Sequence, residues 1–168
     1  MTYATPSNDT EARRLERRKY FRVKLANVLQ AEMKILSIKE KEITLERNTK
    51  ILINDIGPGG LKFTSYLNLP TNDAIIYGIN MQLLGEHYSL TGKIVWSSEV
   101  KKDIFEHGVE FSISESDREK LTSTLFKLAS LLREKPTYTD SNMIEGDPIL
   151  HLRKLIFNNK TEINQSNS

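Results

Sequence analysis

The feature that most restricts the fold of this chain is the alternation of apolar and polar residues in short runs. Such alternation is typical of a strand with one buried face. It occurs in six segments, without helical periodicity between them, at residues 20–35, 51–57, 61–65, 75–81, 90–96 and 105–113. Short strands spaced by turn signals favour a closed antiparallel sheet over a βαβ arrangement. The pattern therefore predicts an all-β fold, a six-stranded antiparallel barrel.

The first of these segments contains a break in its pattern. Phe21, Val23 and Leu25 alternate with polar residues, but the alternation resumes at Leu29 with the opposite parity. A β-bulge shifts the faces of a strand in this way. We therefore expect a bulge or bend at residues 26–28. The charged residues 37–50 predict a hairpin connection or an exposed strand pair.

A single amphipathic helix follows the last strand. Ser116 and Glu119 have the spacing of a capping box, and leucines recur at helical intervals after them. They are Leu121, Leu125, Leu128 and Leu132. The pattern predicts a helix that ends before Pro136 and packs its leucines on the barrel.

The chain accordingly divides into three parts. We expect residues 1–16 to form a flexible basic arm and residues 17–133 to form the barrel domain with its helix. Residues 134–168 hold a turn-rich linker, a short amphipathic helix and a polar tail. The apolar residues of that helix, within 149–156, either pack on the domain or serve a partner, because so short a helix does not fold alone.

Positive charge gathers at the N-terminus. Residues 1–24 carry a net charge of +4, whereas the whole chain carries +2. The positive field is therefore local, which favours a small anionic ligand over bulk nucleic acid.

Several functional classes lack support in the sequence. The chain has no cysteine, which excludes disulfides, thiolate catalysis and cysteine-ligated metals. Its three histidines, His87, His107 and His151, are far apart, and no metal cluster, phosphate loop or catalytic motif is present. We expect a protein that is not an enzyme, with structural histidines and no metal.

Membrane insertion is not expected either. No run approaches the roughly 18 apolar residues that a spanning helix needs, and the polar N-terminus lacks the apolar segment of a secretory signal. These features predict a cytoplasmic chain.

Two segments are candidates for binding. Arg18 and Arg22, preceded by Arg17, begin the first strand. Arginine forks donate paired hydrogen bonds to phosphates or to the O6 and N7 edge of guanine. Taken alone, such a basic arm is more often solvated without a ligand.

The second segment is the turn at residues 54–60. Asp55 offers an acceptor for the N1 and N2 donors of guanine. Gly57, Gly59 and Gly60 permit positive φ and close approach of the backbone to a ligand, with N–H groups exposed. Alone, this segment is more often a tight hairpin turn.

Together the two segments resemble the PilZ domain, a bacterial receptor module for cyclic di-GMP. Arg18 and Arg22 in RKYFR match the family's Arg-x-x-x-Arg motif, and Asp55 and Gly60 in DIGPGG match its Asp/Asn-x-Ser-x-x-Gly motif. The runs GKIVW and HGVEF resemble late barrel strands of the family. The resemblance covers residues 17–133 and implies a six-stranded barrel with cyclic di-GMP bound by Arg17, Arg18, Arg22, Asp55, Gly57, Gly59 and Gly60.

Two positions refine that implication. Gly57 stands where the family has serine, and loss of one neutral hydrogen bond, about 0.5–1.5 kcal/mol, weakens binding by no more than roughly tenfold. An arginine directly before the motif, here Arg17, resembles family members that bind a stacked pair of ligands. The resemblance thus implies two cyclic di-GMP molecules per chain.

The leading hypothesis is a cyclic di-GMP receptor whose arm becomes ordered on binding and which signals through an unknown effector protein. The first alternative is an adaptor of the same fold that binds no ligand and acts through protein contacts. The second is a barrel for single-stranded nucleic acid, which would need aromatic residues interleaved with basic ones. The strands show few, so we expect no nucleic-acid partner.

Overall fold

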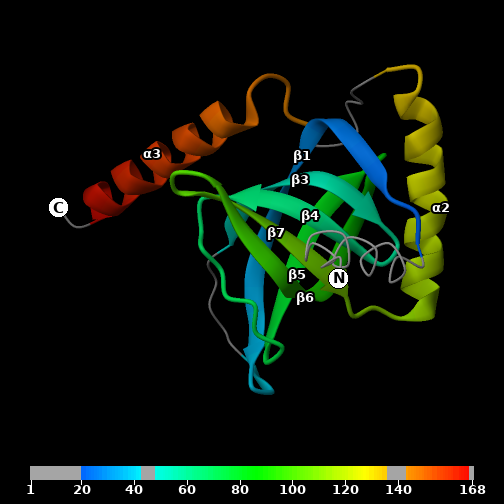
Figure 1. Ribbon diagram of the computed structural model, residues 1–168, viewed down its shortest axis with the longest axis horizontal. Coiled ribbons are helices and arrows are strands. Elements are labelled where there is room, and N and C mark those ends of the chain that lie inside the picture. Colours follow the sequence, from blue (N-terminus) through cyan, green and yellow to red (C-terminus); the bar gives the residue numbers. More distant parts are fainter. Residues whose placement is uncertain (1–19, 43–47, 136–142, 167–168) are drawn as a thin grey trace, which may run out of the picture.

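The computed structural model describes residues 20–42, 48–135 and 143–166, with the side chains of the last segment described up to residue 158. It contains seven strands and two helices in this part of the chain (Figure 1). The strands are β1 (Val23–Ile38), β2 (Lys41–Glu42), β3 (Thr49–Gly57), β4 (Gly60–Ser65), β5 (Ile75–Leu83), β6 (Glu86–Lys101) and β7 (Ile104–Phe111). The helices are α2 (Glu115–Leu132) and α3 (Pro148–Ser166).

Six of these strands form a closed antiparallel ring. Their order is β1-β3-β4-β7-β6-β5, and pairing between β1 and β5 closes the ring. The two-residue strand β2 extends β1 as a hairpin at residues 37–42. Closure leaves no long open edge. The predicted six-stranded barrel is confirmed.

Strand β1 pairs with β3 on one side and with β5 on the other, and it bends along its length. Lys24 pairs with Asp55, but the next paired residue is Leu29, opposite Ile53, so the strand bulges between them. The predicted bulge is therefore confirmed. Beyond it, Glu32 lies opposite Asn80 of β5. The same strand thus joins the two ends of the sheet.

Helix α2 closes one side of the barrel, as predicted. Leu121, Leu125 and Leu128 are fully buried and belong to the same apolar cluster as the barrel interior. The predicted capping box at Ser116 is wrong. Ser114 is the N-cap: its backbone is extended, and its hydroxyl accepts a hydrogen bond from the Asp117 amide at 3.1 Å. Both serines precede an acidic residue by three positions, and the helix begins at the earlier one.

Helix α3 packs against the outside of the barrel, away from α2 (Figure 1). Leu152 is fully buried in a second apolar cluster with Val28, Leu52 and Ile104. The connection to α3 is tied to β1 as well, since the amide of Ile144 donates to the Val28 carbonyl at 2.8 Å. Helix α3 therefore uses its apolar face within the chain. Neither described helix is long and apolar enough to cross a membrane.

Candidate functional site

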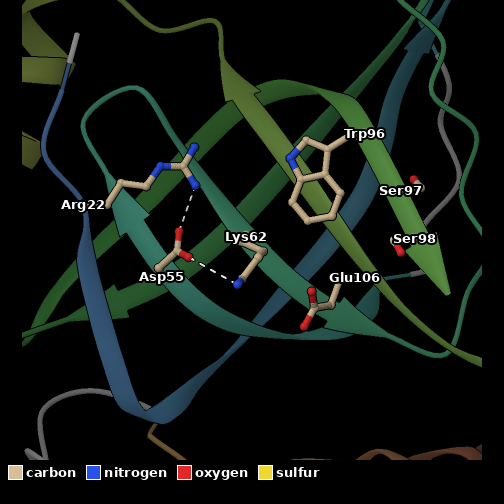
Figure 2. A pocket seen from close by; sticks show the side chains of 7 residues that line it. All are labelled: Arg22, Asp55, Lys62, Trp96, Ser97, Ser98 and Glu106. Carbon is tan, nitrogen blue, oxygen red and sulfur yellow. Dashed lines mark hydrogen bonds and ion pairs between the residues drawn. The ribbon is translucent and has the colours of Figure 1, made fainter. Parts of the chain in front are cut away.

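The two predicted binding segments meet on the outer face of the barrel. Nη1 of Arg22 lies 2.9 Å from Oδ1 of Asp55, across 33 positions of sequence. Nζ of Lys62 lies 3.7 Å from the other carboxylate oxygen, Oδ2. Asp55 is largely buried, and its carboxylate lies between these two cations (Figure 2).

The strand pairing explains why these side chains converge. Asp55 of β3 pairs with Lys24 of β1 on one side and with Lys62 of β4 on the other. Arg22 directly precedes β1 and so reaches Asp55 from that side. Neighbouring strands lie about 4.8 Å apart. The register therefore places Arg22, Asp55 of β3 and Lys62 of β4 in one ion-paired row.

A pocket of about 540 Å³ opens beside this row. Its volume lies within the range of roughly 300–1,000 Å³ typical of small-molecule sites. The lining residues are Arg22, Asp55, Lys62, Trp96, Ser97, Ser98 and Glu106, as Figure 2 shows. The lining thus combines cations, carboxylates, hydroxyls and one aromatic ring.

Trp96 is placed in this pocket by a glycine on the neighbouring strand. Gly108 of β7 lies between Lys62 of β4 and Trp96 of β6 in the sheet. A Cβ at residue 108 would collide with Nε1 of the indole, so the ring lies across the glycine. Gly108 therefore sets the position of Trp96, the one aromatic side chain among the described residues that line the pocket.

The glycine turn between β3 and β4 has a different role from the one its sequence indicated. In the described part of the chain, positive φ occurs at Gly85 and Gly146 but at no glycine of the turn. Gly57 and Gly60 are buried, and Gly59 is half-buried. The expectation of exposed N–H groups at Gly57 and Gly60 is therefore wrong. Glycine is needed at these positions because a side chain would collide with neighbouring atoms.

That space is filled by the chain that leads into β1. A Cβ at residue 57 would collide with the carbonyl oxygen of Phe21, and one at residue 59 would lie 2.6 Å from Cδ2 of Tyr20. A Cβ at Gly60 would instead collide with the carbonyl oxygen of Val109 on β7. The glycine turn thus seats residues 20 and 21 and holds β4 close to β7.

Helix α2 contacts the same two aromatic residues. The rings of Phe21 and Phe126 stack with centroids 4.5 Å apart. The Arg118 guanidinium lies 5.1 Å from the centroid of the Tyr20 ring, and Nη1 of Arg118 donates to the Pro58 carbonyl at 2.8 Å. Residues 20 and 21 are therefore held between the glycine turn and α2, directly before Arg22.

Restoring the family residue at position 57 is expected to destabilise this arrangement. Gly57→Ser introduces a Cβ where the Phe21 carbonyl lies, so the leading segment must move. Overpacking of this kind costs about 1–3 kcal/mol of unfolding free energy. Chemical denaturation measures this loss, and Gly57→Ala should show a similar one because it carries the same Cβ. Unchanged stability of both variants would contradict the tight approach of Phe21 to Gly57.

The predicted site residues fall into three groups. Arg22 and Asp55 line the pocket and contact each other. The three glycines pack beneath the entering chain and β7, outside the pocket lining. Arg17 and Arg18 lie outside the described residues, so their predicted roles stay predictions.

Sequence reasoning missed the five other residues of the described pocket lining, Lys62, Trp96, Ser97, Ser98 and Glu106. They come from three different strands, β4, β6 and β7, and they meet only through the register of the barrel. The run GKIVW contains Trp96 and the run HGVEF contains Gly108. The sequence alone does not show that the Trp96 ring lies over Gly108.

His107 is a structural residue, as its place in a strand indicated. It is fully buried, Nε2 contacts the Leu67 carbonyl at 2.9 Å, and Nδ1 contacts Oγ of Ser97 at 2.6 Å. Burial lowers the pKa of this imidazole, which favours the neutral ring. Among the residues that the structure describes, no three carboxylates or imidazoles are grouped so as to hold a metal ion.

Comparison with solved structures shows the same architecture. The PilZ domain of YcgR from Escherichia coli with cyclic di-GMP aligns with a TM-score of 0.53 and 17% identity, over 71% of this chain and 96% of that one. The Bacillus subtilis inhibitor of motility MotI/DgrA has a TM-score of 0.51 at 16% identity, over 71% and 53%. The MrkH–cyclic di-GMP complex of K. pneumonia has 0.52 at 16%, over 71% and 55%.

At these identities the likeness concerns the fold. This chain spans only about half the length of MotI/DgrA and MrkH, but nearly all of the YcgR domain. No curated protein matches the sequence significantly. The PilZ domain family model matches residues 16–127, which is more than half of the chain. The protein therefore belongs to the PilZ domain family.

Proposed function

We propose that this protein is a cyclic di-GMP receptor that binds its ligand in the pocket beside Arg22 and Asp55. One observation carries the proposal: residues from both binding motifs form an ion pair in that pocket, and an aromatic ring belongs to the same lining. Two of the structural relatives are complexes with cyclic di-GMP, which supports the ligand class.

The chemistry of the pocket suits a guanine nucleotide. The half-buried Trp96 ring offers a face on which a base stacks, and base–aromatic stacking contributes about 1–3 kcal/mol per base. Arg22 donates to a phosphate or to the guanine O6 and N7 edge. Asp55 holds Arg22 and Lys62 in place and prevents the two cations from repelling each other.

The pocket lining does not supply enough positive charge for the ligand by itself. Arg22 and Lys62 are balanced by Asp55 and Glu106, so the lining formed by the described residues is formally neutral. Cyclic di-GMP carries two phosphates, and a stacked pair carries four. Arg17 and Arg18 supply the missing charge in this proposal, in which the arm extends to residue 19 and folds over the ligand. Gly59 and its neighbours hold the base of the arm.

Ordering of the arm then provides the signal. Tyr20 and Phe21 join the arm to the glycine turn and to α2, so a ligand that fixes Arg18 and Arg22 also fixes the surface around Phe126. An effector protein in the bacterial cytoplasm reads this surface. No catalytic step is required of the chain.

Calorimetric titration with cyclic di-GMP tests the receptor function. Saturable heat at micromolar ligand is expected, with two ligands per chain. GMP, which has the same base but cannot span the site, is the control and should bind far more weakly. No heat would overturn the receptor proposal and favour the ligand-free adaptor. One ligand per chain would overturn only the stacked pair.

Limited trypsin digestion tests the ordering of the arm. Arg13, Arg14, Arg17, Arg18 and Lys19 are all cleavage sites within residues 13–19. Saturating cyclic di-GMP should slow cleavage at Arg17 and Arg18 more than at Arg133, the control site at the end of α2. Equal rates with and without ligand would show that the arm does not close over it.

A further inference from the structure

One carboxylate in the pocket has no partner in the described part of the chain. Both oxygens of Asp55 face cations, Arg22 at 2.9 Å and Lys62 at 3.7 Å. The Glu106 carboxylate forms no hydrogen bond or ion pair with any described residue, although it lines the same pocket. Figure 2 shows its side chain among Lys62, Trp96 and Ser98. Its acceptor oxygens are therefore available to a ligand.

The register places Glu106 at the edge of the stacking surface. Gly108, over which the Trp96 ring lies, pairs with Lys62 and Trp96. Glu106 is two residues before Gly108 on β7 and so points to the same face, about 6.6 Å along the strand. A base stacked on the indole would present an edge to this carboxylate.

A carboxylate favours only some ligand edges. It accepts hydrogen bonds and cannot donate, so it needs donors opposite it. The Watson–Crick edge of guanine presents two adjacent donors, N1–H and the N2 amino group. Adenine presents one donor, the N6 amino group, beside an acceptor at N1. In a pocket for an anion, an unmatched carboxylate also repels the ligand.

We propose that Glu106 reads the Watson–Crick edge of a guanine stacked on Trp96 and so selects cyclic di-GMP over cyclic di-AMP. The inference rests on the proposed receptor function and adds its base specificity. It also assigns different tasks to the two acids: Asp55 positions Arg22, and Glu106 contacts the base.

The test compares two ligands on two variants. Calorimetry measures the affinities for cyclic di-GMP and cyclic di-AMP in the wild-type chain, Glu106→Gln and Glu99→Gln. Glutamine keeps the size of the side chain but places an amide donor against a guanine donor. Since a good bidentate contact contributes about 1–3 kcal/mol of base discrimination, the affinity ratio between the two ligands should fall about tenfold or more in Glu106→Gln.

The control and the outcomes separate this inference from the receptor proposal. Glu99 is an exposed acid on β6 outside the pocket lining, and Glu99→Gln should keep the wild-type ratio. An unchanged ratio in Glu106→Gln, with cyclic di-GMP still bound, would overturn the base-reading role alone. An equal loss for both ligands would also overturn it, because it would show that Glu106 holds a protein group. Absence of binding to the wild-type chain would overturn the receptor proposal itself.

Discussion

Arg22→Ala is expected to weaken cyclic di-GMP binding by about tenfold to 100-fold, since charge-assisted hydrogen bonds contribute about 1.5–3 kcal/mol. The substitution removes the donor to the ligand and also frees one oxygen of Asp55, now 2.9 Å from the guanidinium. The exposed carboxylate then faces the ligand phosphates with only Lys62 near it. Calorimetry with cyclic di-GMP measures the change.

A control variant and a conservative substitution show whether the loss of affinity is specific to Arg22. Arg133→Ala removes an exposed arginine outside the pocket lining and should bind as the wild type does. Arg22→Lys keeps the charge but loses the planar fork, so it should fall between the wild type and alanine. If Arg22→Ala retained wild-type affinity, the ligand would not lie beside the Arg22–Asp55 pair.

Leu152→Ala should have the largest effect on stability that the structure indicates for α3. Its side chain is fully buried against Val28, Leu52 and Ile104. Truncation of a buried leucine costs about 2–5 kcal/mol, because it loses the apolar transfer energy and leaves a cavity. Amide hydrogen exchange in α3 measures this loss of stability. It also detects the loss if the helix detaches while the barrel stays folded.

Leu150 provides the matched control on the same helix. Its side chain is 53% exposed, so Leu150→Ala should leave the exchange rates of α3 nearly unchanged. Equal exchange in the two variants would contradict the packing of α3 on the barrel. The apolar residues of this helix would then be available to a partner, the other role that their pattern allowed.

The barrel was predictable because burial follows strand periodicity. Ile79 and Met81 of β5 are buried whereas Asn80 between them is only half-buried, and the parity shift before Leu29 coincides with the observed bulge. The β3–β4 hairpin could be expected from its turn residues. Local sequence does not locate the start of α2, because Ser114 and Ser116 both precede an acidic residue by three positions.

The site was predictable only in part, for a physical reason. Arg22 and Asp55 belong to motifs that can be read within short segments. Lys62, Trp96 and Glu106 have no such local signal, because their meeting depends on the pairing of β4, β6 and β7. The family resemblance implies only the loss of a serine hydroxyl at Gly57, whereas the structure shows the carbonyl of Phe21 in the space that a side chain would need.

The fluorescence of Trp96 tests the central claim most directly, because this residue is the only tryptophan in the chain and it lines the pocket. Stacking of guanine on the indole should quench its emission as cyclic di-GMP is added. The midpoint should match the calorimetric dissociation constant, and Arg22→Ala should shift both midpoints together. Calorimetric saturation with unchanged tryptophan emission would contradict this account, because the ligand would then bind away from Trp96.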